Sequence, residues 1–216
     1  MDPSDDIIQL IVEGGIYGAD CLNVHDGILC YSSKFFQNAL KPGWTNMNAE
    51  SRTIDLSNYP VGTVSDYIKW LYTNKISIDL RLEAAEDDDE ERAEQIEEIF
   101  IALARAYVFG GKIIDARYKN AVLQKLFKAQ KILDWHMGSE SVEIIYEGTP
   151  PESPLRRLVA DVVACKACDD ADEGTGRMQF FDDYPREALV DALKAVARVR
   201  TSTSGYPGVE SYLEKW

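Results

Sequence analysis

The sequence predicts an α+β fold, in which a small, mostly three-stranded sheet is covered by helices and followed by an α-helical extension. Three observations favour this fold class. Short apolar runs rich in β-branched residues occur early in the chain, as expected of strands. From Pro60 onward, apolar residues recur every three to four positions, the spacing of one helical face. Strand patterns fade beyond Lys128, so we expect one domain at residues 1–128 and a helical extension at residues 129–216.

The first expected elements are two strands and a short helix. Residues 7–12 are apolar and β-branched and are soon followed by two glycines, which indicates a buried strand and then a turn. A second strand is expected at about residues 16–24. Ser33 then supplies a capping hydroxyl for a helix at residues 33–40.

The next expected elements are a strand, a helix and a helical hairpin. Residues 52–56 alternate between polar and apolar, as in an edge or half-buried strand. Pro60 begins a helix that Asn74 ends. Gly110 and Gly111 are expected to form the tight turn between two further helices. The apolar stripes of these two helices contain Ile96, Ile99, Phe100, Leu103, Tyr107, Ile113, Ile114, Tyr118, Ala121, Val122 and Leu126.

An acidic segment precedes the hairpin. Residues 83–98 contain ten acids and a single base, Arg92. A segment this polar cannot bury enough apolar surface to offset the entropy that ordering costs. We therefore expect a solvated loop over residues 83–95, before the helical stripe that starts at Ile96.

The extension is expected to consist of helices separated by Pro, Gly and acidic residues. Ser153 followed by Pro154 is typical of a helix start, and Pro185 begins another helix. The buried face of this second helix is predicted at Leu189, Leu193, Val196 and Val199. A last apolar stripe comprises Val209, Tyr212, Leu213 and Trp216. This stripe either folds back on the body of the protein or presents aromatic anchors to a partner.

Charge and composition narrow the function classes. The chain has 216 residues, is 45% hydrophobic and carries a net charge of −14, which argues against nucleic acid as a partner because nucleic acid is bound by clustered Lys and Arg. There is no signal-peptide pattern and no apolar run of the ~20 residues that a membrane helix needs. We expect a protein of the cytoplasm and/or nucleus that is not secreted, with at least three of its four cysteines buried and reduced.

The cysteines and histidines do not point to an enzyme. His25 and Cys30 are close in sequence, yet no third group that could orient them is evident, and a hydrogen-bonded core histidine that orders the strand-to-helix turn is the simpler interpretation. Cys165 and Cys168 have C-x-x-C spacing, but with His136 as the one further candidate they do not complete a four-ligand zinc site. We therefore expect no enzymatic activity, cofactor or metal site, with a small thiol enzyme as a remote alternative.

Residues 25–36 read His-Asp-Gly-Ile-Leu-Cys-Tyr-Ser-Ser-Lys-Phe-Phe, a histidine followed by a hydrophobic pair, two serines and an aromatic pair. This order resembles the BTB/POZ domain family. Residues 43–44 (Gly-Trp) and 50–51 (Glu-Ser) stand where that family has its Gly-aromatic and Glu-Ser elements. Residues 102–109 and 120–122 are most similar to BTB proteins of filamentous fungi. The residues that carry the family signature are Asp6, His25, Leu29, Ser32, Ser33, Phe36 and Tyr72.

The resemblance covers residues 5–128 and implies the BTB/POZ fold and a function in protein–protein interaction. It implies a scaffold or adaptor that self-associates through the first BTB helix and recruits other proteins. Because the segment before the first strand is short, we expect a homodimer without the exchanged N-terminal strand of some animal members. Asp26, Gly27 and Lys34 depart from the family's usual basic residue and proline, which changes the surface there.

The tripeptide Ile96-Glu97-Glu98 resembles the hydrophobic-x-acidic element with which many BTB adaptors contact a cullin. The resemblance thus implies a cullin-RING ubiquitin ligase as a partner, with Ile96 and Glu98 at the contact. Alternatively, Ile96 is the first core residue of its helix and the two glutamates complement the positive end of the helix dipole. The chain would then be a self-assembling or transcription-associated regulator without a cullin partner.

Overall fold

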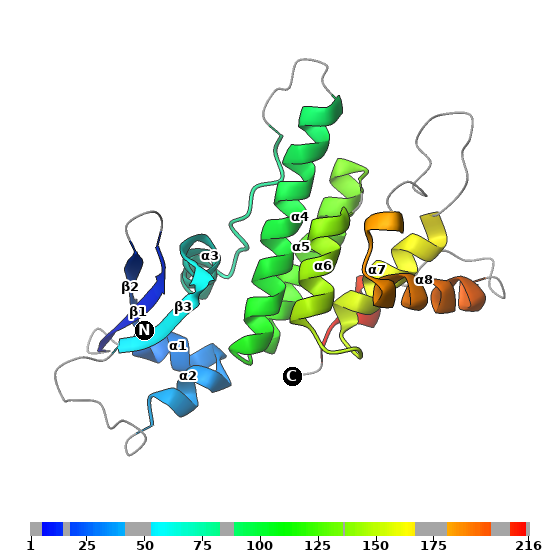
Figure 1. Cartoon of the computed structure of the whole chain (residues 1–216). Helices are drawn as coiled ribbons and strands as arrows, with labels where there is room; N and C mark the ends of the chain where they lie inside the picture. Colours follow the sequence, from blue (N-terminus) through cyan, green and yellow to red (C-terminus); the bar gives the residue numbers. More distant parts are fainter. Residues whose placement is uncertain are drawn as a thin grey trace.

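The computed structural model describes residues 6–14, 18–41, 53–82, 89–135, 137–166, 181–199 and 208–214. The fold is α+β, as predicted. A small sheet lies at one end of the molecule, and the helices extend away from it (Figure 1). The sequence motifs at residues 43–44 and 50–51, and the side chains of His136, Cys168 and Trp216, lie outside the described residues.

The sheet has β1 at its centre. β1 (Ile7–Glu13) pairs antiparallel with β2 (Ala19–His25) and parallel with β3 (Thr53–Pro60), which gives the order β2-β1-β3. Buried residues alternate along β1 because successive side chains of a strand point to opposite faces. They are Ile8, Leu10 and Val12. β3 is an edge strand, as predicted, and continues to Pro60.

Two short helices follow β2. α1 (Asp26–Ser32) and α2 (Lys34–Ala39) are separated by one residue, Ser33. The predicted N-cap is confirmed, because the backbone N–H of Phe36 donates to Ser33 Oγ at 3.2 Å. The cap satisfies one of the first N–H groups of α2, and the N–H groups of Lys34 and Phe35 donate to the carbonyls of Ile114 and Ile113.

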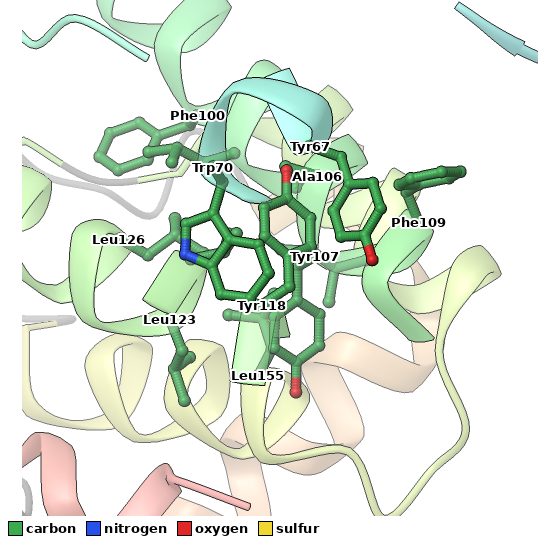
Figure 2. Packing of buried hydrophobic residues seen from close by; sticks show 14 of the residues in the cluster. Tyr67, Trp70, Phe100, Ala106, Tyr107, Phe109, Tyr118, Leu123, Leu126 and Leu155 are labelled. Atoms are coloured by element: carbon green, nitrogen blue, oxygen red, sulfur yellow. The ribbon is translucent and has the colours of Figure 1, made fainter. Parts of the chain in front are cut away.

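The next helix, α3 (Val61–Thr73), begins after Pro60 and ends at Asn74, as predicted. Asn74 has a left-handed φ of 53°, a conformation that asparagine tolerates at helix ends. Aromatic side chains join α3 to the hairpin: the ring centroid of Tyr67 lies 4.9 Å from that of Tyr118 in an edge-to-face contact (Figure 2). This aromatic cluster lies between the sheet end of the molecule and the long helices.

The hairpin is formed by α4 (Asp89–Lys112) and α5 (Ala116–Leu133), as predicted. α4 starts earlier than expected, so the loop prediction is wrong for residues 89–95. Glutamate and alanine have high helix propensities, and acidic side chains stabilise the first turns of a helix, so this polar segment continues the helix without burying apolar surface. Residues 83–88 lie outside the described part of the chain.

The turn of the hairpin is not formed by Gly110 and Gly111, which corrects the prediction. Both glycines lie in the last turn of α4, and the turn follows at residues 113–115. A Cβ added at Gly110 would lie 2.8 Å from Cγ of Lys119, so this glycine permits the close approach of α5. Ile114, expected in the apolar stripe, instead has a φ of 54° and is 55% exposed.

The extension is helical, as predicted. Its elements include α6 (Ser139–Gly148), α7 (Pro154–Lys166), α8 (Arg186–Val199) and the short 3-10 helix η2 (Val209–Tyr212). The boundary expected after residue 128 falls inside α5. α6 packs along α4, and one buried apolar cluster runs from Ile8 in the sheet to Tyr212 in η2. The two predicted parts therefore share a core.

The predicted buried face of α8 is wrong in part. Leu193 is 71% exposed, Leu189 and Val196 are only half-buried, and the side chain of Val199 lies outside the described residues. Among the described side chains of α8, the buried ones are Ala188, Ala192 and Ala195. α8 packs along α7, and the small alanine side chains allow the two helices to approach closely, which turns the larger residues outward.

The prediction that at least three cysteines are buried is also wrong. Cys21 is exposed, and Cys30 and Cys165 are partly exposed. Cys21 lies on the outer strand β2, where alternation places it on the face opposite to the buried Val24.

Candidate interaction surface

The corner between β2 and α1 is held by hydrogen bonds from three elements. His25, the last residue of β2, has an extended backbone that leads into α1. Its Nδ1 lies 2.6 Å from the hydroxyl of Tyr72 on α3, and its backbone N–H donates to the same hydroxyl at 3.3 Å. The N–H of Asp26 donates to the carbonyl of Asp6 at 2.9 Å. His25 thus lies hydrogen-bonded at the turn, as expected, but it is half-buried rather than part of the core.

Ser33 joins the two short helices to the hairpin turn. It is fully buried, and its Oγ donates to the carbonyl of Ile113 at 2.5 Å while accepting from Phe36. The N–H of Phe35 donates to the same Ile113 carbonyl at 3.3 Å. Ser32 differs, because its hydroxyl is buried without a hydrogen-bond partner among the described residues. Ser33 therefore fixes the position of α1 and α2 against the hairpin.

Leu29 and Phe36, the other signature residues of this region, are core residues. Both are fully buried, and the Phe36 ring stacks on Tyr67 at 6.3 Å between centroids. The Tyr67 hydroxyl in turn donates to Asp115 at 2.9 Å. Burial is the main reason that the pKa of Tyr67 lies far above its ordinary value, and the nearby Asp115 carboxylate raises it further. These residues hold α1 in place and leave its outer face free for contacts.

Large apolar side chains are exposed on α1, on α3 and at the end of β1 that pairs with His25. Tyr31, on α1, is 78% exposed, and the Arg117 guanidinium of α5 lies 5.0 Å from the centre of its ring. Ile7, the β1 partner of His25, is 59% exposed, and Tyr72 is 41% exposed. Ile7, Tyr31 and Tyr72 are termed the α1 surface. Exposed aromatic residues beside an arginine are typical of the central residues of protein interfaces.

Sequence reasoning missed Ile7 and Tyr31 as candidate contact residues. Ile7 belongs to an apolar run that Gln9 interrupts, and nothing within that run distinguishes the exposed Ile7 from Ile8, which is fully buried. Tyr31 stands inside the family-like motif, where its neighbours Leu29 and Ser33 are buried. A helical wheel of α1 could have placed Tyr31 on the outer face, because it lies two positions from Leu29.

The two residues of the predicted cullin contact lie in different environments, one in the core and one on the surface. Ile96 is fully buried in α4, as the alternative interpretation of a core residue expected, so its side chain is not accessible to a partner in this conformation. Glu98 is exposed. These positions follow from helix geometry, because residues two apart lie on different faces of a helix.

Glu97, between them, has a structural role that the sequence did not indicate. Its carboxylate accepts the backbone N–H of Gly138 at 2.7 Å and that of Ser141 at 2.9 Å, both at the start of α6. Burial raises the pKa of Glu97, although these hydrogen bonds oppose the rise. Gly138 has no side chain with which to cap α6, and this is the signal that an acceptor from elsewhere was needed.

The environment of Cys30 does not favour a reactive thiol. Burial, and secondly the carboxylate of Asp26, raise the pKa of Cys30, which disfavours the nucleophilic thiolate. His25 directs its Nδ1 to Tyr72, not to a cysteine. Within the described residues, no cluster of three or more His, Cys, Asp or Glu side chains could hold a metal ion.

The last apolar stripe folds back on the body of the protein, which is one of the two alternatives. Tyr212 is fully buried, and Leu213 is half-buried against the core. The Tyr212 hydroxyl donates to Asp161 of α7 at 2.9 Å. These two residues therefore anchor the segment within the chain.

Comparisons of the chain with protein-family models, with curated proteins and with solved structures find no match. Among the helices that the structure describes, none combines the length and apolar character needed to cross a membrane. The chemistry of the exposed surfaces is therefore the guide to function. An exposed aromatic surface that is rigidly supported from behind can bind another protein.

Proposed function

We propose that this chain is a non-enzymatic scaffold or adaptor of the BTB/POZ type, which self-associates through the α1 surface and recruits protein partners through other surfaces. The observation that carries the proposal is the exposure of Tyr31 and Ile7 around a helix whose inner side is fixed by Ser33, Leu29 and Phe36. Such a surface loses little conformational entropy on binding, because the helix is already held in place.

The proposed assembly is a homodimer without exchange of an N-terminal strand. In a two-fold interface the same surface is used by both copies, so a change at Tyr31 acts twice. Apolar and aromatic side chains gain free energy when a second copy removes them from water. Arg117, which already lies over the Tyr31 ring, limits the exposed hydrophobic area of the free chain.

The test is light scattering coupled to size exclusion of the full chain over a concentration series. We expect a dimer that Tyr31→Glu or Ile7→Glu converts to a monomer, because a buried unpaired carboxylate would be costly at the interface. Leu193→Glu is the matched control, because the exposure of Leu193 lies between those of Tyr31 and Ile7 and because it lies on α8, far from α1 (Figure 1). A monomeric wild type, or a dimer that only Leu193→Glu disrupts, would contradict the proposal.

The proposal has two forms, which differ in the protein that the dimer recruits. A cullin-RING ligase would be contacted through Glu98, since Ile96 is buried. The burial of Ile96 favours the alternative form, a self-assembling or transcription-associated regulator without a cullin. A pull-down with purified cullin distinguishes the two forms. The cullin form is supported if the wild type is captured, Glu98→Arg abolishes capture and Glu94→Arg does not. Glu94 is the control because it is also exposed on α4.

A further inference from the structure

Residues 208–214, termed the Tyr212 segment, lie against two helices that are distant in sequence. The segment comprises η2 and the extended residues that follow it, and it packs between α5 and α7. Side chains of these two helices contact this one short segment. This is the arrangement by which a folded protein binds a peptide ligand.

The main chain of the segment is bound by two side chains. Asn120 is buried on α5, and its amide makes a pair of hydrogen bonds with Glu214: Nδ2 donates to the carbonyl at 2.8 Å and Oδ1 accepts the N–H at 2.7 Å. Arg157 of α7 donates to the carbonyl of Ser211. Both contacts are made to backbone N–H and C=O groups, which every peptide has. They would therefore bind the backbone of any peptide that follows the same course.

The side chains of the segment are bound at two specific places. Tyr212 is fully buried, with its hydroxyl on the nearly buried carboxylate of Asp161 and the Arg157 guanidinium 5.0 Å from the centre of its ring. The Glu214 carboxylate pairs with Lys119, an ammonium group that is itself mostly buried on α5. The first place selects an aromatic ring with a hydroxyl, and the second selects an acidic residue two positions later.

We infer that the surface of α5 and α7 that contacts the Tyr212 segment, termed the groove, is a peptide-recognition site for the sequence Tyr-apolar-Glu, and that the Tyr212 segment fills it in cis. A partner protein with such a sequence in an extended segment binds when it displaces the Tyr212 segment. Because the segment belongs to the same chain, it competes at an effective concentration of roughly millimolar, which makes the free groove rare. The inference goes beyond the proposed self-association and does not depend on the α1 surface.

The experiment uses the full chain and a fluorescently labelled peptide of residues 208–214, Gly-Val-Glu-Ser-Tyr-Leu-Glu. Fluorescence anisotropy is measured for the wild type and for Tyr212→Ala, which weakens the cis contact and leaves every groove residue intact. We expect the peptide to bind Tyr212→Ala at least tenfold more tightly than the wild type. Tyr212→Ala must keep a cooperative unfolding transition, and if it does not, Glu214→Ala replaces it in the same comparison.

Charge reversal tests the specificity of the groove. On the Tyr212→Ala background, Lys119→Glu is expected to lower the peptide affinity at least tenfold, and a peptide with Lys in place of Glu214 is expected to restore it. Lys128→Glu, on the exposed face of α5, is the matched control and should leave the affinity unchanged.

Three outcomes would overturn the inference. The first is a folded Tyr212→Ala chain that binds the peptide no more tightly than the wild type. The second is an equal effect of Lys119→Glu and Lys128→Glu. The third is a wild-type dimer that Tyr212→Ala converts to a monomer, which would assign the segment to a second copy. Tyr31→Glu should not change peptide binding, so failure of the α1 proposal is distinguishable from failure of this one.

Discussion

Replacement of Glu97 by alanine should destabilise the protein, because this side chain caps α6, a helix whose N-cap residue lies 41 positions later. Its carboxylate accepts the N–H groups of Gly138 and Ser141, which lose their acceptor in the variant. Loss of a helix cap costs about 1 kcal/mol, and loss of a hydrogen bond to a charged group costs about 1.5–3 kcal/mol. Burying the charged carboxylate costs free energy in the wild type, which offsets part of the stabilisation from these hydrogen bonds. We therefore expect Glu97→Ala to lower the free energy of unfolding by about 1–2 kcal/mol.

The measurement is urea unfolding of the full chain followed by far-UV circular dichroism. The matched control is Glu98→Ala, because Glu98 is the next residue of α4 and is exposed, so its removal should change stability by no more than about 0.5 kcal/mol. If Glu97→Ala and Glu98→Ala have equal unfolding free energies, the capping role assigned to Glu97 is wrong.

The same site predicts a pH dependence with a definite sign. Burial raises the pKa of Glu97 in the folded protein, so the folded state binds the proton more tightly than the unfolded chain does. The stability of the wild type relative to Glu97→Gln, which does not titrate, should therefore fall as the pH rises from about 4.3, the ordinary value for glutamate, through the raised pKa. A relative stability that increases across this window would mean that the hydrogen bonds, rather than burial, dominate.

Two further predictions concern the core, and urea unfolding measures both. Tyr67→Phe leaves the buried Asp115 without the hydroxyl donor and should cost about 1–3 kcal/mol, whereas Tyr118→Phe removes a buried hydroxyl that has no partner among the described residues and should be close to neutral. Equal effects of the two would contradict the assigned hydrogen bond. Gly110→Ala forces a Cβ against α5 and should cost about 1–3 kcal/mol, whereas the adjacent Gly111→Ala has room and should stabilise the helix by up to about 1 kcal/mol. A stabilising Gly110→Ala would refute the close approach.

The features that could be predicted from the sequence depend on interactions between residues close in the chain. Ser33 caps α2 through a residue three positions later, and Pro60 and Asn74 mark the ends of α3 through their own backbone preferences. The strand β1 follows from an apolar β-branched run. In each case the cause and the result lie within a few residues.

The features that were missed depend on distant residues. Gly110 was assigned to a turn, but its role is set by Lys119 on the neighbouring helix. Leu193 was assigned to the core, but alanines on the other face of α8 pack on α7 instead. The partners of the candidate groove are further apart still, since Asn120 and Glu214 are separated by 94 positions. No local pattern contains this information.

Residues 1–128 should not fold as an independent domain, although the sequence placed a boundary there. A cut after residue 128 removes the last turn of α5, in which Ala129 and Leu133 are buried. It also removes α6, which packs so tightly on α4 that a Cβ added at Gly148 would lie 2.5 Å from the side chain of Val108. The shortened chain should therefore bind a hydrophobic dye and unfold without a cooperative transition in urea. A cooperative transition without dye binding would instead show that residues 1–128 fold as a domain, as the sequence predicted. If the dye binds as expected, self-association of residues 1–128 alone would report exposed core rather than the α1 surface, which is why the dimer must be measured on the full chain.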